Sequence, residues 1–379
     1  MKKSFKLTTI FNIPIEINYS WFIILGLIIY TLANGYFPQT NPGLASEVYW
    51  FMAVISALML FSSLLAHELA HSIVARNNKI PIHGITLFIF GGVAQMDKEP
   101  PSPNVEFKMA IAGPIMSFCL AIIFFGLSQG LFNLGVSGPI LSMLYYLAML
   151  NMVVGLFNMI PGFPLDGGRI LRAFLWHSFK DIKRATAIAS NIGKGFAFIL
   201  IAFGIFNLLN GSLISGIWFI FIGLFVQEAA NGSYRQVIMK KILTGIKVEN
   251  FMTKSVIIVP ANLTLDKLVE EYFFKFRHAS FPVMEDDLIL GLVTFHDIKE
   301  IDKDEWTKKT ARDIMLPLSE QLVSGKDVEA MDAMTKLVHN GVGRLLIIEK
   351  SKLVGVLSQK DIMQLFKYKA ELEGGREAD

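Results

Sequence analysis

The sequence is poor in cysteine and in charged residues, and both shortages limit what the protein can be. Cys119 is the one cysteine, so disulfide bonds within the chain are excluded. Charged residues make up only 18% of the 379 residues and hydrophobic residues 53%, whereas about a quarter of a soluble domain is charged. The net charge of +3 indicates no nucleic-acid partner. This composition is typical of a protein that crosses a membrane several times and also has soluble mass.

Long apolar runs predict six membrane spans in a lipid bilayer. The runs lie at residues 19–33, 48–74, 107–132, 140–160, 185–209 and 213–226. Lysine and arginine are missing from the segments after the first, third and fifth runs, and they occur at the N-terminus and in the remaining segments. Basic residues collect on the cytoplasmic side of a membrane. We therefore expect a multi-pass protein of the cell membrane with both termini in the cytoplasm.

Two stretches of the apolar half favour β-structure. Residues 80–96, between the second and third runs, contain a β-prone stretch at 85–90 followed by Gly91 and Gly92. This segment predicts a hairpin or a re-entrant strand, with a plain cytoplasmic turn as the alternative. Residues 10–18 alternate weakly and predict a short strand at the membrane surface.

The second run contains the motif His67-Glu68-Leu69-Ala70-His71. On a helix the two histidines lie on one face, where their imidazoles can bind one Zn²⁺ and leave positions for a third ligand and a water. Glu68 can take a proton from that water. Chance is the alternative, but each ionisable group at membrane depth costs about 2.5 kcal/mol or more. A metal site gives a reason for three such groups in five residues.

A third ligand is expected from the polar cluster at residues 158–169. Two prolines and three glycines end the fourth apolar run there, and Asp166 is its one acidic residue. Under the predicted topology Asp166 and the two histidines lie at a similar depth near the cytoplasmic face. The alternative role for Asp166 is a turn or a helix cap.

These motifs together resemble the site-2 proteases, a family of intramembrane zinc metalloproteases. The resemblance is carried by H-E-L-A-H, by N-x-x-P-x-x-P-L-D-G-G at 158–168, by A-G-P at 112–114 and by F-G-G at 90–92, and it covers roughly residues 10–227. The family usually has N-P at the asparagine, whereas here Met159 and Ile160 separate Asn158 from the first proline.

The resemblance implies a role for each matching residue. His67, His71 and Asp166 would bind one zinc ion, Glu68 would be the catalytic base, and Asn158 would hold the substrate or the oxyanion. Asn151, in the same run as Asn158, is a further candidate whose alternative role is a hydrogen bond between helices.

The implied reaction is hydrolysis of a peptide bond within a membrane-spanning segment of another protein, such as a membrane-tethered regulator. A helical substrate must first unwind, because its carbonyls are engaged in hydrogen bonds. We expect the strand at 85–90 to receive the unwound peptide as an added strand.

The remainder of the chain contains a sequence repeat. Residues 291–297 return as 355–361, and 250–252 return as 313–315, and each unit predicts the order strand, helix, strand, strand, helix. The expected organisation is a protease domain at 1–232, a flexible linker at 233–246, repeats at 247–305 and 306–370, and a polar tail at 371–379.

The repeats resemble a tandem pair of cystathionine-β-synthase (CBS) domains, a regulatory module that often binds ATP, ADP or AMP. The resemblance implies that Asp297 and Asp361 bind ribose hydroxyls, with Thr294 and Ser358 near phosphate. The alternative is helix capping, because threonine and serine are good N-caps and aspartate is favoured in a first turn. The resemblance also allows a homo-oligomer through these modules.

The predicted fold is therefore a multi-span α-helical membrane protein with a short β-hairpin element, followed by an α/β regulatory domain of two CBS repeats. The predicted function is an intramembrane zinc metalloprotease modulated by adenine nucleotide. One alternative is a nucleotide-gated transporter or channel, which would need polar residues on several spans, but the fifth and sixth runs have few. Another is a catalytically silent binder of membrane segments, against which the intact Glu68 argues.

Overall fold

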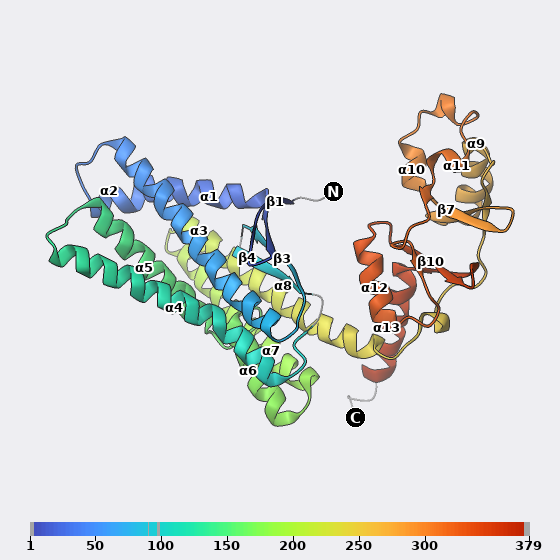
Figure 1. Cartoon of the computed structure of the whole chain (residues 1–379). Coiled ribbons are helices and arrows are strands. Elements are labelled where there is room, and N and C mark those ends of the chain that lie inside the picture. Colours follow the sequence, from blue (N-terminus) through green and yellow to red (C-terminus); the bar gives the residue numbers. More distant parts are fainter. Residues whose placement is uncertain (1–3, 90, 97–98, 375–379) are drawn as a thin grey trace. The chain divides into compact units, whose positions relative to one another are not determined.

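The computed structural model describes residues 4–89, 91–96 and 99–374 (Figure 1). The chain divides into two compact units, Met1–Val237 and Ile238–Asp379. The first unit contains all six apolar runs, and the second contains the sequence repeat. Phe90 of the predicted strand and residues 375–379 of the predicted tail lie outside the described residues.

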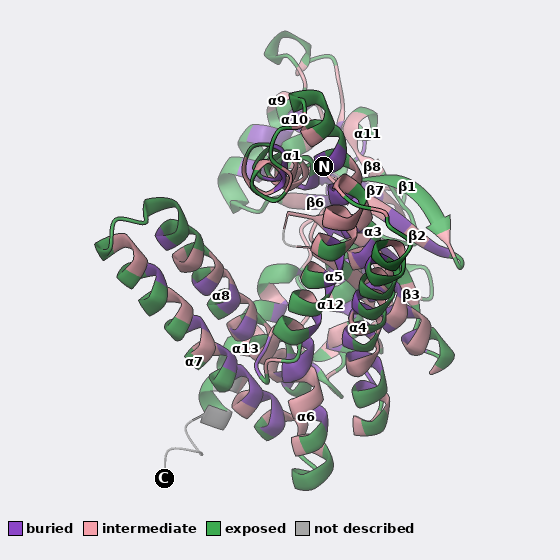
Figure 2. Ribbon diagram, turned by 90° about the vertical axis from the view of Figure 1, so that its left-hand side faces the viewer, coloured by how far each residue is buried: buried purple, intermediate pink, exposed green. Residues whose placement is uncertain are grey.

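Long helices make up most of the first unit. They are α1 (Ser20–Thr31), a π-helical turn η1 (Leu32–Tyr36), α2 (Phe37–Thr40), α3 (Ser46–Asn77), α4 (Pro103–Asn133), α5 (Pro139–Asn158), α6 (Asp166–Phe179), α7 (Ile182–Leu209) and α8 (Leu213–Leu243), the last of which continues into the second unit. Among the described residues, six helical segments are long and apolar enough to cross a membrane, which confirms the six predicted spans. Figure 2 shows exposed residues along α7 and α8, and large apolar side chains such as Phe198 and Ile214 are among them, as expected of a surface that faces lipid.

The first unit also contains a small sheet of four strands. They are β1 (Ser4–Ile10), β2 (Ile13–Asn18), β3 (Ile82–Phe88) and β4 (Gly91–Met96), in the order β1-β2-β3-β4. β3 and β4 are antiparallel, so the hairpin predicted at 80–96 is confirmed. The strand predicted at 10–18 is instead a hairpin, because the chain turns at Phe11 and Asn12 with φ of 49° and 60°.

The sheet packs on α3 at the metal-binding motif. The inward face of β2 consists of Ile13, Ile15 and Ile17, each at most 4% exposed. They share one apolar cluster with Leu69, which lies between the two motif histidines on α3. Full burial of one such side chain is worth about 1.5–3 kcal/mol, so this cluster fixes the sheet against the helix.

The loop between α5 and α6 packs through its backbone. A Cβ on Gly162 would lie 2.7 Å from Cα of Gly193 in α7, and one on Gly168 would lie 2.4 Å from the carbonyl carbon of Gly162. The backbone N–H of Phe163 donates to the carbonyl oxygen of Ala189 at 3.2 Å. The loop therefore lies directly on α7 and delivers Asp166 to the first turn of α6, a helix that the apolar runs did not predict.

The second unit contains two copies of the predicted order of elements. The first copy has β5 (Val259–Pro260), α9 (Leu265–Lys267) with η3 (Leu268–Phe274), β6 (Ser280–Glu285), β7 (Leu288–Thr294) and α10 (Phe295–Lys299). The second has β9 (Val323–Ser324), α12 (Ala330–His339), β10 (Arg344–Glu349), β11 (Lys352–Ser358) and α13 (Gln359–Gly374). Short elements precede or join them: η2 (Val248–Asn250), η4 (Lys303–Glu305), α11 (Ala311–Ile314) and β8 (Leu316–Pro317). The sheets have the orders β5-β6-β7-β8 and β11-β10-β9.

Each CBS-like repeat, here called a module, is preceded by a short segment that packs on the core of the other module. Val248 is buried in the core of the second module, and Ala311 is buried in the core of the first. The end of α8 also belongs to the second core, through Ile242 and Leu243. The flexible linker predicted at 233–246 is therefore wrong as far as Leu243, because apolar contacts hold that stretch as helix.

Candidate metal centre

The three predicted zinc ligands lie together in the interior of the first unit. His67 and His71 of α3 and Asp166 of α6 are 4%, 7% and 9% exposed. Oδ2 of Asp166 lies 3.1 Å from Nε2 of each histidine, and the two Nε2 atoms are 3.2 Å apart. Tetrahedral zinc with bonds of about 2.0 Å requires ligand atoms about 3.3 Å apart. The three donor atoms therefore match three corners of a zinc site.

The neighbouring helix α4 orients both imidazole rings. Nδ1 of His71 donates to the carbonyl oxygen of Met109 at 2.6 Å, because a carbonyl oxygen only accepts. Nδ1 of His67 pairs with Oγ of Ser117 at 2.9 Å. Both contacts hold Nε2 toward Asp166, and a second ring contact of this kind is usual for metal-binding histidines.

Gly113 of α4 leaves the space that a metal ion needs. A Cβ at this position would lie 2.1 Å from Nε2 of His71 and 2.5 Å from Nε2 of His67. Any side chain would therefore stand against the two atoms that face the metal position. This space, together with two imidazoles and a carboxylate, fits a resident zinc ion.

Glu68 lies next to the small sheet. It follows His67 on α3, and its side chain is half-buried. A Cβ on Gly92 would come within 2.5 Å of Cγ of Glu68, so β4 passes directly over the carboxylate side chain. The candidate base therefore lies next to β4, which is an edge strand of the described sheet.

The two asparagines of α5 make different contacts. Nδ2 of Asn158 donates to the carbonyl oxygen of Val154 in its own helix at 3.1 Å. This contact does not bring its amide to the three ligands. Nδ2 of Asn151 donates to Oγ of Ser63 on α3 at 3.3 Å, which is the hydrogen bond between helices given above as its alternative role.

The four residues predicted to bind nucleotide close two capping boxes. The carboxylate of Asp297 accepts from the backbone N–H and the hydroxyl of Thr294 at 2.9 and 2.8 Å. Asp361 accepts from Ser358 in the same way at 2.8 and 2.7 Å. A third box of this geometry joins Thr310 to Asp313, where the backbone N–H of Thr310 and then its hydroxyl lower the pKa of the carboxyl. The contacts are those of the capping alternative.

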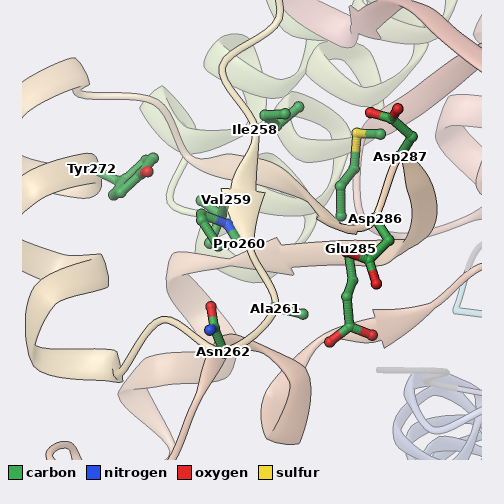
Figure 3. A pocket seen from close by; sticks show the side chains of 10 residues that line it. Ile258, Val259, Pro260, Ala261, Asn262, Tyr272, Glu285, Asp286 and Asp287 are labelled. Carbon is green, nitrogen blue, oxygen red and sulfur yellow. The ribbon is translucent and has the colours of Figure 1, made fainter.

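Hollows in the two modules lie elsewhere. One of about 600 Å³ in the first module is lined by Ile258, Val259, Pro260, Ala261, Asn262, Tyr272, Met284, Glu285, Asp286 and Asp287 (Figure 3). Another of about 640 Å³ is lined by residues of the second module that include Ser324 and Lys336. Neither lining includes the four residues above. Three carboxylates beside the first hollow make it unfavourable for a phosphate group.

Two imidazoles and one carboxylate, held inside a bundle of membrane-length helices beside a glutamate, define a membrane-embedded metallopeptidase.

Comparison with known proteins identifies the family. The profile of peptidase family M50 matches residues 55–137 and 133–202, and that of the CBS domain matches 248–304 and 325–368. The chain is 33% identical to Zinc metalloprotease MJ0392 of Methanocaldococcus jannaschii, over 98% of this chain and 100% of that protein. It is 32% identical to a Mycobacterium tuberculosis protein provisionally named zinc metalloprotease Rip3, over 96% of this chain and 93% of that protein.

A solved structure is also similar. The Site-2 Protease from Methanocaldococcus jannaschii is 36% identical, covers 61% of this chain and 95% of its own, and superposes with a TM-score of 0.43. The relatives that match along nearly the whole chain decide the assignment. The protein belongs to peptidase family M50, the site-2 proteases, and carries a tandem pair of CBS domains.

Proposed function

We propose that the protein hydrolyses a peptide bond within a membrane-spanning segment of another protein, with His67, His71 and Asp166 as its zinc ligands. The observation that carries the proposal is the triangle of donor atoms about 3 Å apart, inside a bundle of membrane-length helices. Family membership supports the reaction class.

The proposed mechanism assigns proton transfer to Glu68 and substrate binding to Asn158. Zinc, when bound, supplies a Lewis acid that lowers the pKa of a water and polarises the scissile carbonyl. Glu68 accepts the proton and passes it to the leaving amine. Because Gly92 has no side chain, the Glu68 carboxylate would have room to move from the water to the leaving amine. Asn158, at the end of α5, would donate to the substrate after releasing the carbonyl of Val154.

The edge of β4 is the proposed docking strand for the unwound substrate. β3 pairs with β2 on one edge and with β4 on the other, so the strand predicted to receive the peptide has no edge left for it. β4 ends the described sheet and touches Glu68 through Gly92. A peptide added to β4 would gain backbone hydrogen bonds and bring its carbonyls beside the base.

The transporter alternative has little support in the described helices. The buried polar residues of α7 are Thr186 and Ser190, and none of the described residues of α8 is a buried polar one. A path for ions or polar solutes needs such groups on several spans. The deciding experiment is co-expression of the wild type and Glu68→Gln with candidate single-span proteins, in which only the wild type is expected to release a fragment.

We also propose that both termini lie in the cytoplasm. Cysteines at Ser46, the first residue of α3, and at Ser212, directly before α8, should react with an impermeant thiol reagent added to cells after Cys119→Ser. The segments around both positions lack lysine and arginine. A cysteine at Ser178, in the basic segment at the end of α6, should not react in intact cells but should react after lysis. The reverse labelling pattern would overturn the orientation.

We further propose that adenine nucleotides bind the CBS pair and change the cleavage rate. Support comes from the family. The hydroxyls of Thr294 and Ser358 would reach a phosphate only after they release the carboxylates of Asp297 and Asp361. A nucleotide acts only through different affinities for two states, and a tenfold change in rate needs about 1.4 kcal/mol. ATP, ADP or AMP at millimolar concentration should raise the unfolding temperature of the full-length protein in detergent.

Asp297→Ala with Asp361→Ala should abolish the nucleotide response and leave zinc content unchanged. Loss of a cap by itself costs about 1 kcal/mol. Asp313→Ala is therefore the matched control, because it removes a capping box of the same geometry in the same unit. A response that survives in the double variant, or that is equally lost in the control, would contradict the assignment of these residues.

A further inference from the structure

A buried ion pair joins α4 to α6. Glu106, in the first turn of α4, is 0% exposed, and its Oε1 accepts from Nε of Arg172 at 2.7 Å and from Nη2 of the same side chain. Arg172 lies on α6 and is 5% exposed. The mechanism above gives neither residue a role. A buried ion pair in a membrane unit is unfavourable to form and requires a reason.

The pair connects the helix that orients the histidines to the helix that begins with Asp166. Met109, three residues after Glu106 on α4, holds Nδ1 of His71. Ser117, further along α4, holds Nδ1 of His67. On the other side, Arg172 lies six residues after Asp166 on α6. The ion pair therefore links the helix whose groups contact both histidines to the helix that carries Asp166.

Arg172 also touches the loop that precedes Asp166. Its guanidinium carbon lies 5.1 Å from the centroid of the Phe163 ring. Phe163 in turn packs with Ala189 of α7 and Ala230 of α8. One arginine thus contacts α4 through its N–H groups and the ligand loop through its flat face.

We infer that Glu106 and Arg172 are positioning residues that hold Asp166 at bonding distance from the two histidines. The inference rests on the zinc centre proposed above. Two N–H groups of the Arg172 guanidinium converge on the single oxygen Oε1 of Glu106, which restricts the direction of the contact as well as its distance. Lysine, as a point charge on one nitrogen, does not reproduce this pair of contacts. Neither partner leaves easily, because an unpaired buried charge is strongly disfavoured.

The test uses the full-length protein in detergent and three variants: Glu106→Gln, Arg172→Lys, and the apolar double variant Glu106→Leu with Arg172→Met. Zinc affinity is measured by competition with a chelator, and ligand geometry by the visible spectrum of the cobalt-substituted protein. The single variants should bind zinc about 10- to 100-fold more weakly, as for other residues that orient metal ligands, with an altered cobalt spectrum. Arg184→Lys is the control, because Arg184 stacks on Phe179 at 4.5 Å without a buried acid.

The double variant separates positioning from stability. It removes both fully buried charges, and the remaining cation near the site, Arg169, lies 4.0 Å from Oε1 of Glu106 and keeps 19% of its side chain exposed. The metal-free unfolding temperature of the double variant should therefore return toward the wild-type value while zinc affinity stays low. Wild-type zinc affinity in the double variant, or in both single variants, would overturn the inference and reduce the pair to a stabilising contact. A wild-type protein that binds no zinc would instead overturn the zinc centre itself.

Discussion

Glu68→Gln is expected to keep one zinc ion per chain and to lose cleavage. Glutamine has almost the shape of glutamate, and Glu68 is not one of the three converging donors, so the metal site should stay intact. An amide cannot accept the water proton, and general-base catalysis contributes about 10²- to 10⁴-fold in rate. Fragment release from a single-span substrate in nanodiscs should therefore fall by at least about 100-fold, while zinc measured by atomic absorption stays unchanged.

His67→Ala is the companion control, because it should lose zinc and cleavage together. A Glu68→Gln protein that cuts at the wild-type rate would place the base elsewhere. The inactive variant also traps substrate for a test of the docking strand. A cysteine at Val93, a half-exposed residue of β4, should cross-link to a cysteine near the scissile bond. A cysteine at Leu134, an exposed residue at the end of α4 and 21 positions after Gly113, should not cross-link to the substrate cysteine.

Gly113→Ala is expected to remove zinc although it changes no ligand. The added Cβ would stand 2.1 Å from Nε2 of His71, and both rings would have to move by more than the tolerance of about 0.2 Å in zinc bond lengths. Alanine is otherwise favoured over glycine inside a helix by about 0.5–1 kcal/mol, so α4 itself should not weaken. Zinc affinity should fall by about 100-fold or more, beyond the effect of losing one orienting contact.

Gly126→Ala is the matched control on the same helix. A Cβ at Gly126 meets no atom within 4 Å, so this variant receives the gain in helix propensity without the clash. Its zinc content and cleavage rate should equal those of the wild type. Tight zinc binding by Gly113→Ala would show that the rings have room that the present geometry lacks, and the ligand assignment would then have to be revised.

The three residues of the candidate metal centre could be found in the sequence from local features. His67 and His71 share a helix face whatever the rest of the fold, and Asp166 stands alone as the acid of an irregular segment. The orienting groups could not be predicted. Ser117 is 50 positions from His67, and Arg172 is 66 positions from Glu106, and no local pattern indicates which distant helix faces meet.

Other differences have local physical causes. The β1–β2 hairpin was missed because its turn uses Phe11 and Asn12 at positive φ, without the glycine that usually marks such a turn. The two CBS repeats were visible as repeats, but the exchange of their preceding segments was not, because Val248 and Ala311 are apolar residues that could pack on either core.

The backbone packing of the Asp166 loop has a consequence for reading natural variants of this chain. None of Gly162, Gly167, Gly168 and Gly193 has a positive φ, so these positions need glycine for lack of volume and not for backbone freedom. A natural variant with a larger residue at any of these positions should therefore lose metal although His67, His71 and Asp166 are unchanged. Gly193 would be the most deceptive case, because it lies on a different helix and 27 positions after Asp166.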